Sequence, residues 1–152
     1  MKSFETSGSR VATLLAAVIM LLGSLQLQAQ TPKEWKQLKG DVTLYMANDL
    51  GRNGYYDQKP IAELMGEMAK TTGMECVLAV GDIHHFNGVA SVNDPLWMTN
   101  FEQVYSHPEL MLDWFPVLGN HEYRGNTQAV LDYGKVSRRW MMPACYYTKV
   151  FE

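Results

Sequence analysis

The chain has 152 residues, and its 13 Lys and Arg side chains against 16 Asp and Glu give a formal net charge of −3. A mildly acidic chain offers no electrostatic footprint for nucleic acid or for an anionic membrane surface. Cys76 and Cys145 are the only cysteines. Because Cys76 lies within the apolar run "CVLAV", we expect two free thiols rather than a disulfide.

Residues 1–29 have the pattern of a cleavable signal peptide. A weakly basic start is followed by an apolar run at 11–22, and Ala29 stands before a plausible cleavage point. A membrane anchor is the alternative, but a spanning helix needs about 20 apolar residues, and Gly23, Ser24 and Gln26 interrupt this run. We therefore expect a periplasmic or secreted protein with no stable membrane anchor after cleavage.

After a polar lead-in at 30–40, the sequence predicts a strand, a helix and a second strand. "DVTLYMAND" at 41–49 and "ECVLAVGD" at 75–82 are mostly apolar, as strands buried on both faces are. Between them, apolar residues recur at helical spacing from Ile61 to Ala69; Asp57 is a candidate N-cap, and Gly73 ends the pattern. Strand, helix and strand at this length form a βαβ unit.

The alternation continues towards the C-terminus. Asp94 and Pro95 are a helix-start pair, and "WFPVLGN" at 114–120 is a short strand in which Pro116 favours an edge or early position. Residues 126–140 predict a further helix, and "ACYYTKVFE" has the composition of a fourth strand. A strand there suggests that the chain stops within a domain.

Polar side chains follow each of the first three predicted strands. Asp49 comes after the first, Asp82 after the second, and Asn120 and His121 after the third. In open α/β sheets the carboxyl edge is where ligands bind. Mixed Asp, Asn and His ligands suit zinc, manganese or iron better than calcium. Two such ions about 3.5–4 Å apart would serve phosphoester hydrolysis.

The motifs "DLG", "GDIHHFNGV" and "GNHEYRGN" in this order resemble those of the calcineurin-like metallophosphoesterases. The likeness is greatest to the small purple, or tartrate-resistant, acid phosphatases and their bacterial relatives, and it continues through "VNDPLWMTNFEQVYSHPEL" and "VSRRWMMPACYYT". It covers roughly residues 40–149. The resemblance implies an α/β fold, the first βαβαβ half of a metallophosphoesterase β-sandwich flanked by helices, with residues 41–152 as the N-terminal part of that domain.

The resemblance also implies a role for each motif residue. Asp49 would bind the first metal, Asp82 would bridge both, and Asn120 would bind the second and contact substrate. His121 would contact the phosphate or protonate the leaving oxygen. His85 would be a metal ligand where the purple enzymes carry tyrosine, which predicts a colourless site. His84 stands where relatives keep an aromatic ring and is not expected to bind metal, and Asn48 replaces their usual glycine.

The family completes its site with three further histidines, and no histidine follows His121. We therefore expect an exported, metal-dependent hydrolase of small phosphate monoesters, present as an incomplete chain with an incomplete ligand set for its two metal ions (Fe, Zn or Mn) and inactive alone. A phosphodiesterase of the same superfamily and a noncatalytic remnant or binding protein are the alternatives. Two roles stay open for three side chains of the first loop: packing, or lining the phosphate pocket. These side chains are Arg52, Tyr55 and Tyr56. His107 is expected to be an ordinary loop residue.

Overall fold

The structure is a computed structural model that describes residues 32–151, within the compact unit Thr31–Glu152. The predicted signal peptide at 1–29 lies outside the described residues. No helix in the described part of the chain is long and apolar enough to cross a membrane.

Three parallel strands form the sheet, in the order β1-β2-β3. They are β1 (Leu44–Ala47), β2 (Cys76–Val80) and β3 (Asp113–Val117), and all three predicted strands are confirmed. Leu44 pairs with Cys76, and Cys76 pairs in turn with Asp113. Because β3 is at the end of this order, Pro116 lies in an edge strand, where its missing N–H is tolerated.

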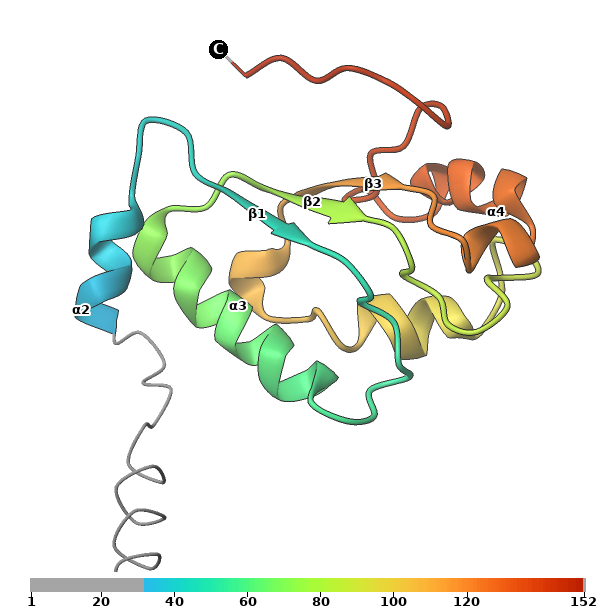
Figure 1. Ribbon diagram of the computed structural model, residues 1–152, viewed down its shortest axis with the longest axis horizontal. Helices are drawn as coiled ribbons and strands as arrows, with labels where there is room; N and C mark the ends of the chain where they lie inside the picture. The colour runs from blue at the N-terminus through green and yellow to red at the C-terminus, as the bar shows by residue number, and fades with distance from the viewer. Residues whose placement is uncertain (1–31, 152) are drawn as a thin grey trace, which may run out of the picture. The chain divides into compact units, whose positions relative to one another are not determined.

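Helix α3 (Gln58–Thr72) makes the crossover between β1 and β2 (Figure 1). It ends at Gly73, whose left-handed φ of 70° closes the last turn with a hydrogen bond to the Ala69 carbonyl, as the sequence predicted. Asp57 occupies the N-cap position, but its side chain makes no capping hydrogen bond. The predicted position of this helix is therefore confirmed, whereas Asp57 does not cap it through its side chain.

The connection from β2 to β3 contains η2 (Met98–Glu102), a π-helical turn, and η3 (Pro108–Leu110). Asp94 accepts a hydrogen bond from the Leu96 amide, so the predicted helix start is confirmed. The apolar side of this connection is buried in an aromatic core. Its fully buried rings include Trp97, Phe101, Tyr105, Trp114 and Trp140.

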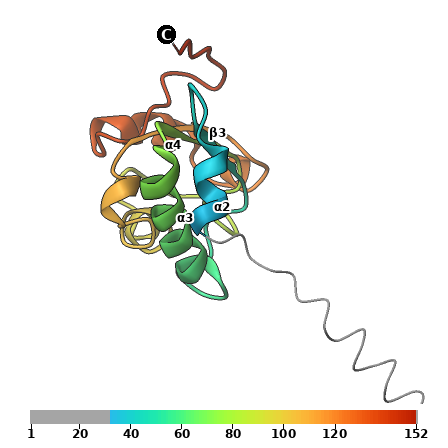
Figure 2. The same ribbon diagram turned by 90° about the vertical axis from the view of Figure 1, so that its left-hand side faces the viewer.

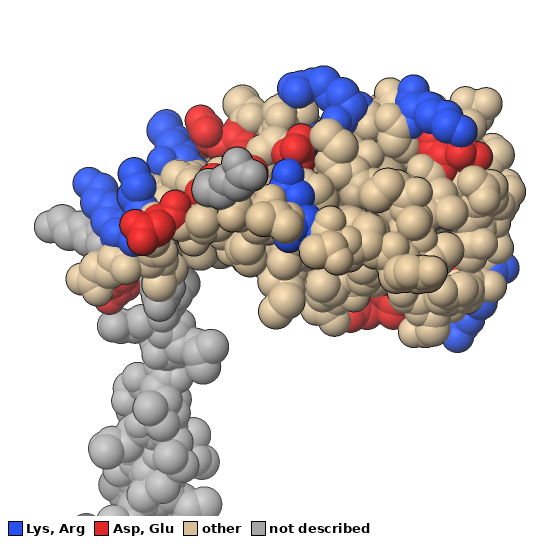
Figure 3. Space-filling model, turned by 90° about the horizontal axis from the view of Figure 1, so that it is seen from above, with Lys and Arg blue, Asp and Glu red and all other residues tan. Residues whose placement is uncertain are grey.

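The two faces of the sheet differ in how far they are covered. Val77, Ala79 and Trp114 are fully buried on the face that α3 and the helical turns cover. On the other face, Met46 is 67% and Val80 41% exposed, because side chains alternate between faces along a strand. Figure 3 looks onto the molecule from that side, where uncharged side chains occupy most of the surface.

The C-terminal part contains η4 (Glu122–Arg124), α4 (Thr127–Asp132) and η5 (Tyr133–Lys135), so the predicted helix at 126–140 is shorter than expected. The predicted fourth strand is wrong: no strand occurs at 143–151. The free edge of β3 is used instead by the segment 139–141, since the Trp114 amide bonds Arg139 and its carbonyl bonds Met141. Pro116, two residues after Trp114 in β3, has no N–H to donate to a neighbouring strand.

Within the polar lead-in predicted at 30–40, the described residues 32–38 are helical. They form α2 (Pro32–Trp35) and η1 (Lys36–Leu38), which pack against α3 (Figures 1 and 2). Trp35 is only 6% exposed. One buried tryptophan therefore makes this segment part of the folded unit, which its otherwise polar composition did not indicate.

Candidate metal centre

Three loops meet at the carboxyl edge of the sheet because all three strands run parallel. Asp49 and Asp82 each lie two residues beyond their strands, β1 and β2, and His121 lies four residues beyond β3. The second and third loops are in direct contact: a Cβ on Gly119 would lie 2.2 Å from the Asp82 Oδ1 atom. Only glycine allows this approach, which brings the predicted bridging carboxylate against the loop that carries His121.

Asp49 and Asp82 both have a left-handed backbone, with φ of 55° and 54°. Left-handed residues other than glycine are uncommon, although Asp tolerates this region better than most. The Asn48 side-chain amide donates a 2.6 Å hydrogen bond to Asp49 Oδ2. The departure at Asn48 from the family's usual glycine thus supplies a donor that orients the neighbouring carboxylate.

The His85 imidazole is buried and has one nitrogen directed at Asp49. Its Nδ1 lies 2.8 Å from the Gly51 carbonyl oxygen. Because a carbonyl only accepts, Nδ1 carries the proton and Nε2 keeps its lone pair. Nε2 lies 3.5 Å from Asp49 Oδ1. Metal-bound histidines commonly use a backbone carbonyl in this way to fix the tautomer and the ring orientation.

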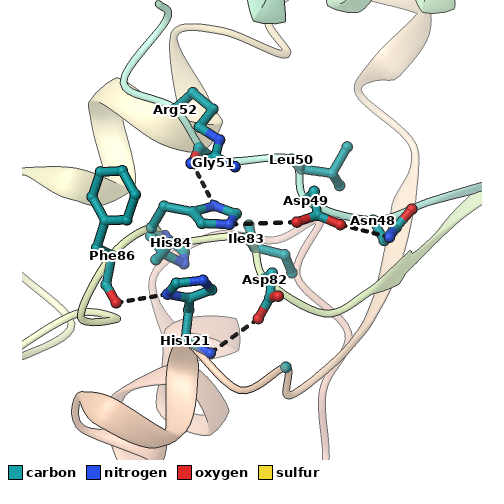
Figure 4. Close-up of polar contacts among 12 residues, drawn as sticks. Asn48, Asp49, Leu50, Gly51, Arg52, Asp82, Ile83, His84, Phe86 and His121 are labelled. Atoms are coloured by element: carbon teal, nitrogen blue, oxygen red, sulfur yellow. Dashed lines mark hydrogen bonds and ion pairs between the residues drawn. The ribbon is translucent and has the colours of Figure 1, made fainter.

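His121 has the same arrangement on the other side of the cluster. Its Nδ1 lies 2.6 Å from the Phe86 carbonyl oxygen, which leaves Nε2 free. Its backbone amide donates to Asp82 Oδ1 at 3.0 Å (Figure 4). The rings of His85 and His121 are 4.1 Å apart between centroids, so both imidazoles line the same small space.

Three of these side chains could hold one metal ion. Asp82, His85 and His121 each offer a ligand atom, and the three atoms lie within 4.8 Å of one another. Ligands of one tetrahedral zinc ion, each about 2.0–2.2 Å from it, lie about 3.3–3.6 Å apart. The three donors would therefore have to close by up to about 1.5 Å to share one ion. The predicted roles of His121 towards the phosphate and the leaving oxygen stay predictions.

Asn120 lies at the same edge of the sheet, between Gly119 and His121 in the third loop. Its side chain is exposed. Within the described part of the chain, that side chain makes no hydrogen bond to the other candidate residues. Its predicted role as a ligand of the second metal stays a prediction.

The structure separates His84 from His85. His84 is fully buried and packs edge-on against Trp97, with ring centroids 4.3 Å apart. Burial lowers the pKa of the His84 imidazole to about 3. Neither of its ring nitrogens has a hydrogen-bond partner among the described residues. His84 is therefore a neutral member of the aromatic core, which agrees with the expectation that it does not bind metal.

The first loop is held in shape by Gln58, the first residue of α3, which is only 6% exposed. Its Oε1 accepts hydrogen bonds from the Arg52 and Gly54 amides, and its Nε2 donates to the carbonyls of Leu50 and Asn100. One buried side chain thus satisfies four backbone groups. The loop that begins at Asp49 is anchored to α3 and to η2.

A cavity of about 480 Å³ lies between this loop and His85. Arg52, Tyr55, Tyr56 and Phe86 line it, and the Arg52 guanidinium lies 5.5 Å from the centre of the Phe86 ring. Tyr55 is 71% and Tyr56 85% exposed. Side chains this exposed contribute little to core packing, and a role for them in the phosphate pocket stays a prediction.

A second group of possible metal ligands lies on α3, where Glu63 and Glu67 approach His107. The His107 Nδ1 accepts a hydrogen bond from the Glu109 amide. In the neutral ring the proton is therefore on Nε2, which faces Glu67 at 3.6 Å. An N–H cannot ligate a metal, so this group is a polar surface contact rather than a ready metal site.

Sequence reasoning missed Asn48, Gln58 and Glu122, which hold the loops without lining the cluster. Their partners are mostly backbone groups, which leave no pattern in side-chain chemistry. For Glu122 the available signal was its place directly after His121 in "GNHE".

A parallel sheet with carboxylates and imidazoles gathered at its carboxyl edge defines the chain as a partial α/β fold of the metallophosphoesterase type. No family model matches the chain. Its sequence is 35% identical to purple acid phosphatase 7 of Arabidopsis thaliana over 105 residues, which are 69% of this chain and 32% of that protein. Purple acid phosphatase 4 of the same plant is 32% identical over 88% of this chain and 40% of its own length.

Tartrate-resistant acid phosphatase type 5 of Sus scrofa is 36% identical over 60% of this chain and 27% of its own length. The chain is homologous to the purple acid phosphatases and spans about a third of the length of these relatives. Among solved structures, "GAP50 the anchor in the inner membrane complex of Plasmodium" is similar, with a TM-score of 0.63 and 26% identity over 70% of this chain and 35% of that one.

Proposed function

We propose that the chain supplies metal-binding and substrate-orienting loops of a phosphate monoester hydrolase. The observation that carries this proposal is the arrangement of His85, whose Nδ1 proton is held by the Gly51 carbonyl while Nε2 faces Asp49 at 3.5 Å. An imidazole prepared in this way beside a carboxylate is suited to metal ligation. The homology to purple acid phosphatases supplies the class of reaction.

Each candidate residue receives one role in this proposal. Asp49 and His85 bind one metal ion, Asp82 bridges to a second, and Asn120 ligates the second and contacts the phosphate. Two ions of iron, zinc or manganese would, when bound, polarise the phosphoryl oxygens and make a water molecule easier to deprotonate. The negative charge that the phosphate brings is thus met by the cations rather than by the mildly acidic protein.

His121 is the residue that we assign to proton transfer at the leaving oxygen. Since the Phe86 carbonyl holds its Nδ1–H, only Nε2 can give or take a proton on the side of the cluster. Nε2 of the neutral ring is an acceptor, so it would first take a proton from solvent; the imidazolium Nε2–H would then contact the phosphate or be donated to the leaving oxygen, which returns the Nδ1–H tautomer. Arg52 and the aromatic rings of the adjacent cavity would hold the rest of a small phosphorylated substrate.

The ligand set within these 152 residues contains no histidine after His121. We therefore propose that these residues alone bind two metal ions only weakly and are inactive alone. Dialysis against a weak chelator followed by elemental analysis tests this point, and we expect well under two ions per chain to remain. Retention of two ions per chain would contradict the proposal.

His85 and His84 form a natural pair for testing the metal site. We expect His85→Ala to lose most of its zinc affinity in a calorimetric titration, and His84→Ala to keep it despite reduced stability. Equal losses in the two variants would remove His85 from the ligand set. In the longest available form of the protein, turnover of 4-nitrophenyl phosphate against bis(4-nitrophenyl) phosphate separates a monoesterase from a phosphodiesterase.

Export is also proposed, with residues 1–29 as a cleavable signal peptide leading to the periplasm or the exterior. The apolar run at 11–22 and Ala29 support it. N-terminal sequencing of the mature protein tests it, and we expect the mature chain to begin at Gln30.

A noncatalytic binding protein is the second candidate, favoured by the similarity to a structure described as an anchor in the inner membrane complex of Plasmodium. A noncatalytic binding protein would keep the fold and show no affinity for metal ions. Zinc titration of wild type beside His85→Ala separates the two, because a noncatalytic scaffold would show no difference between them.

A further inference from the structure

The Glu122 carboxylate lies between two of the ligand loops and is fully buried. Its Oε2 accepts hydrogen bonds from the Asp82 amide at 2.9 Å and from the Gly119 amide at 2.8 Å. Its Oε1 accepts from the amides of Ile83 at 2.8 Å and His84 at 2.9 Å. One side chain therefore binds three successive amides after β2 and one amide after β3.

From this contact set we infer that Glu122 is a positioning residue that sets the metal-ligand geometry before any metal binds. The amide of Asp82 itself is one of its four donors, and Gly119 begins the loop that carries Asn120 and His121. Fixing both loops on one carboxylate fixes the separation of Asp82 from His121. The inference deepens the proposed function, since it concerns the geometry of that same site.

A carboxylate is the group that this position requires. It has two oxygens and about four acceptor sites, and all four amides use them. Hydrogen bonds from N–H groups to an ionised oxygen are short and strong, and they offset the cost of burying the charge. The isosteric amide of glutamine has one acceptor oxygen, and its NH₂ group would face two of the N–H donors. Glu122→Gln thus keeps the volume and loses half of the contacts.

A backbone readout tests the inference without any metal. In metal-free wild type, we expect the amides of Asp82, Ile83, His84 and Gly119 to exchange with deuterium at least ten-fold more slowly than the loop amides of the exposed residues Tyr56 and Tyr146. In Glu122→Gln, we expect at least two of the four to exchange ten-fold faster. Exchange of the four at exposed-loop rates in wild type would overturn the inference, even if the variant failed to fold.

Zinc affinity, measured by calorimetry with zinc alone, is the second readout. We expect a loss of ten-fold or more in Glu122→Gln, the size typical for groups that orient metal ligands. Leu110→Ala is the matched control, because Leu110 is fully buried in η3, away from the cluster; it should lower thermal stability and leave zinc affinity unchanged. An equal loss of affinity in the two variants would reduce Glu122 to a merely structural residue.

The two readouts also separate this inference from the proposed function. If wild type takes up no zinc and the four amides still depend on Glu122, the positioning role stands and the metal proposal fails. If zinc binds and the four amides are insensitive to Glu122→Gln, the metal proposal stands and the positioning role fails.

Discussion

Gly51 and Ile83 are in direct backbone contact: a Cβ on Gly51 would lie 1.7 Å from the Ile83 carbonyl oxygen. This contact seats the first ligand loop on the second and brings the Gly51 carbonyl to the His85 ring. Backbone atoms cannot move aside as the end of a flexible side chain can. The distance between Asp49 and His85 therefore depends on the absence of a side chain at position 51.

We expect Gly51→Ala to force these loops apart, to destabilise the fold by about 3 kcal/mol and to weaken zinc binding. Urea unfolding and zinc calorimetry measure the two effects. Gly40→Ala is the control, since a Cβ there would meet its nearest atom, the Val42 carbonyl oxygen, at an ordinary 3.5 Å. A variant at position 51 as stable as the one at position 40 would contradict the close packing.

Acid sensitivity should follow from His84. Burial lowers its pKa to about 3 from an ordinary value of 6.5, so the unfolded chain binds the extra proton throughout that interval. The contribution of neutral His84 to the free energy of unfolding is fully present above about pH 6.5. It falls as the pH drops towards 3, by about 3 kcal/mol between pH 7 and pH 4. We expect His84→Phe to remove this dependence, because the ring nitrogens have no partner to lose.

Urea unfolding at pH 7 and pH 4 measures this effect as the change in unfolding free energy between the two pH values. The change should be smaller in His84→Phe than in wild type by about 3 kcal/mol. Parallel pH profiles for the two proteins would show that His84 is accessible to protons in the folded state.

Arg139 should be the most costly charge to remove. It is 3% exposed, its Nη2 lies 2.8 Å from Glu102 Oε2, and its guanidinium stacks 4.1 Å from the centre of the Phe101 ring. Arg139→Met leaves the Glu102 carboxylate with the Tyr133 hydroxyl but without its cationic partner, and we expect a loss of about 3 kcal/mol in urea unfolding. Arg138→Met, next to it on the exposed surface, should change stability by less than about 0.5 kcal/mol.

Arg52 should affect ligand binding rather than stability, since its guanidinium lines the cavity beside His85. We expect Arg52→Gln to weaken binding of phenyl phosphate to the zinc-loaded protein by about ten-fold, or about 1.4 kcal/mol. Isothermal titration measures this, with Arg138→Gln as the surface control. An unchanged affinity would mean that the guanidinium serves only its contact with Phe86.

Much of the fold was predictable because its patterns are local. Apolar runs indicated β1 and β2, helical spacing indicated α3, and Gly73 marked the end of that helix. The predicted fourth strand failed because β-rich composition does not supply a pairing partner: the segment at 139–141 takes the edge of β3, and residues 144–151 pair with none of the described strands. Trp35 was missed because a single buried ring in a polar stretch produces no periodicity.

For the candidate site, the sequence predicted which side chains follow the parallel strands, but not the long-range contacts that position them. Asp49, Asp82 and His121 were expected at one edge because parallel strands end together. The contacts of Glu122 with Asp82, Ile83 and His84 span 38 to 40 residues. They join a side chain to backbone amides that every residue except proline possesses, so no residue type identifies them in advance.

Gln58 joins the first loop to the body of the protein through neutral groups alone: its side-chain amide meets four backbone groups. A carboxamide does not titrate, so this anchor has the same strength in acid and at neutral pH. Any change in ligand affinity between those conditions would then report protonation of the ligand, the imidazoles or the carboxylates. The first loop can serve as a constant reference in such measurements.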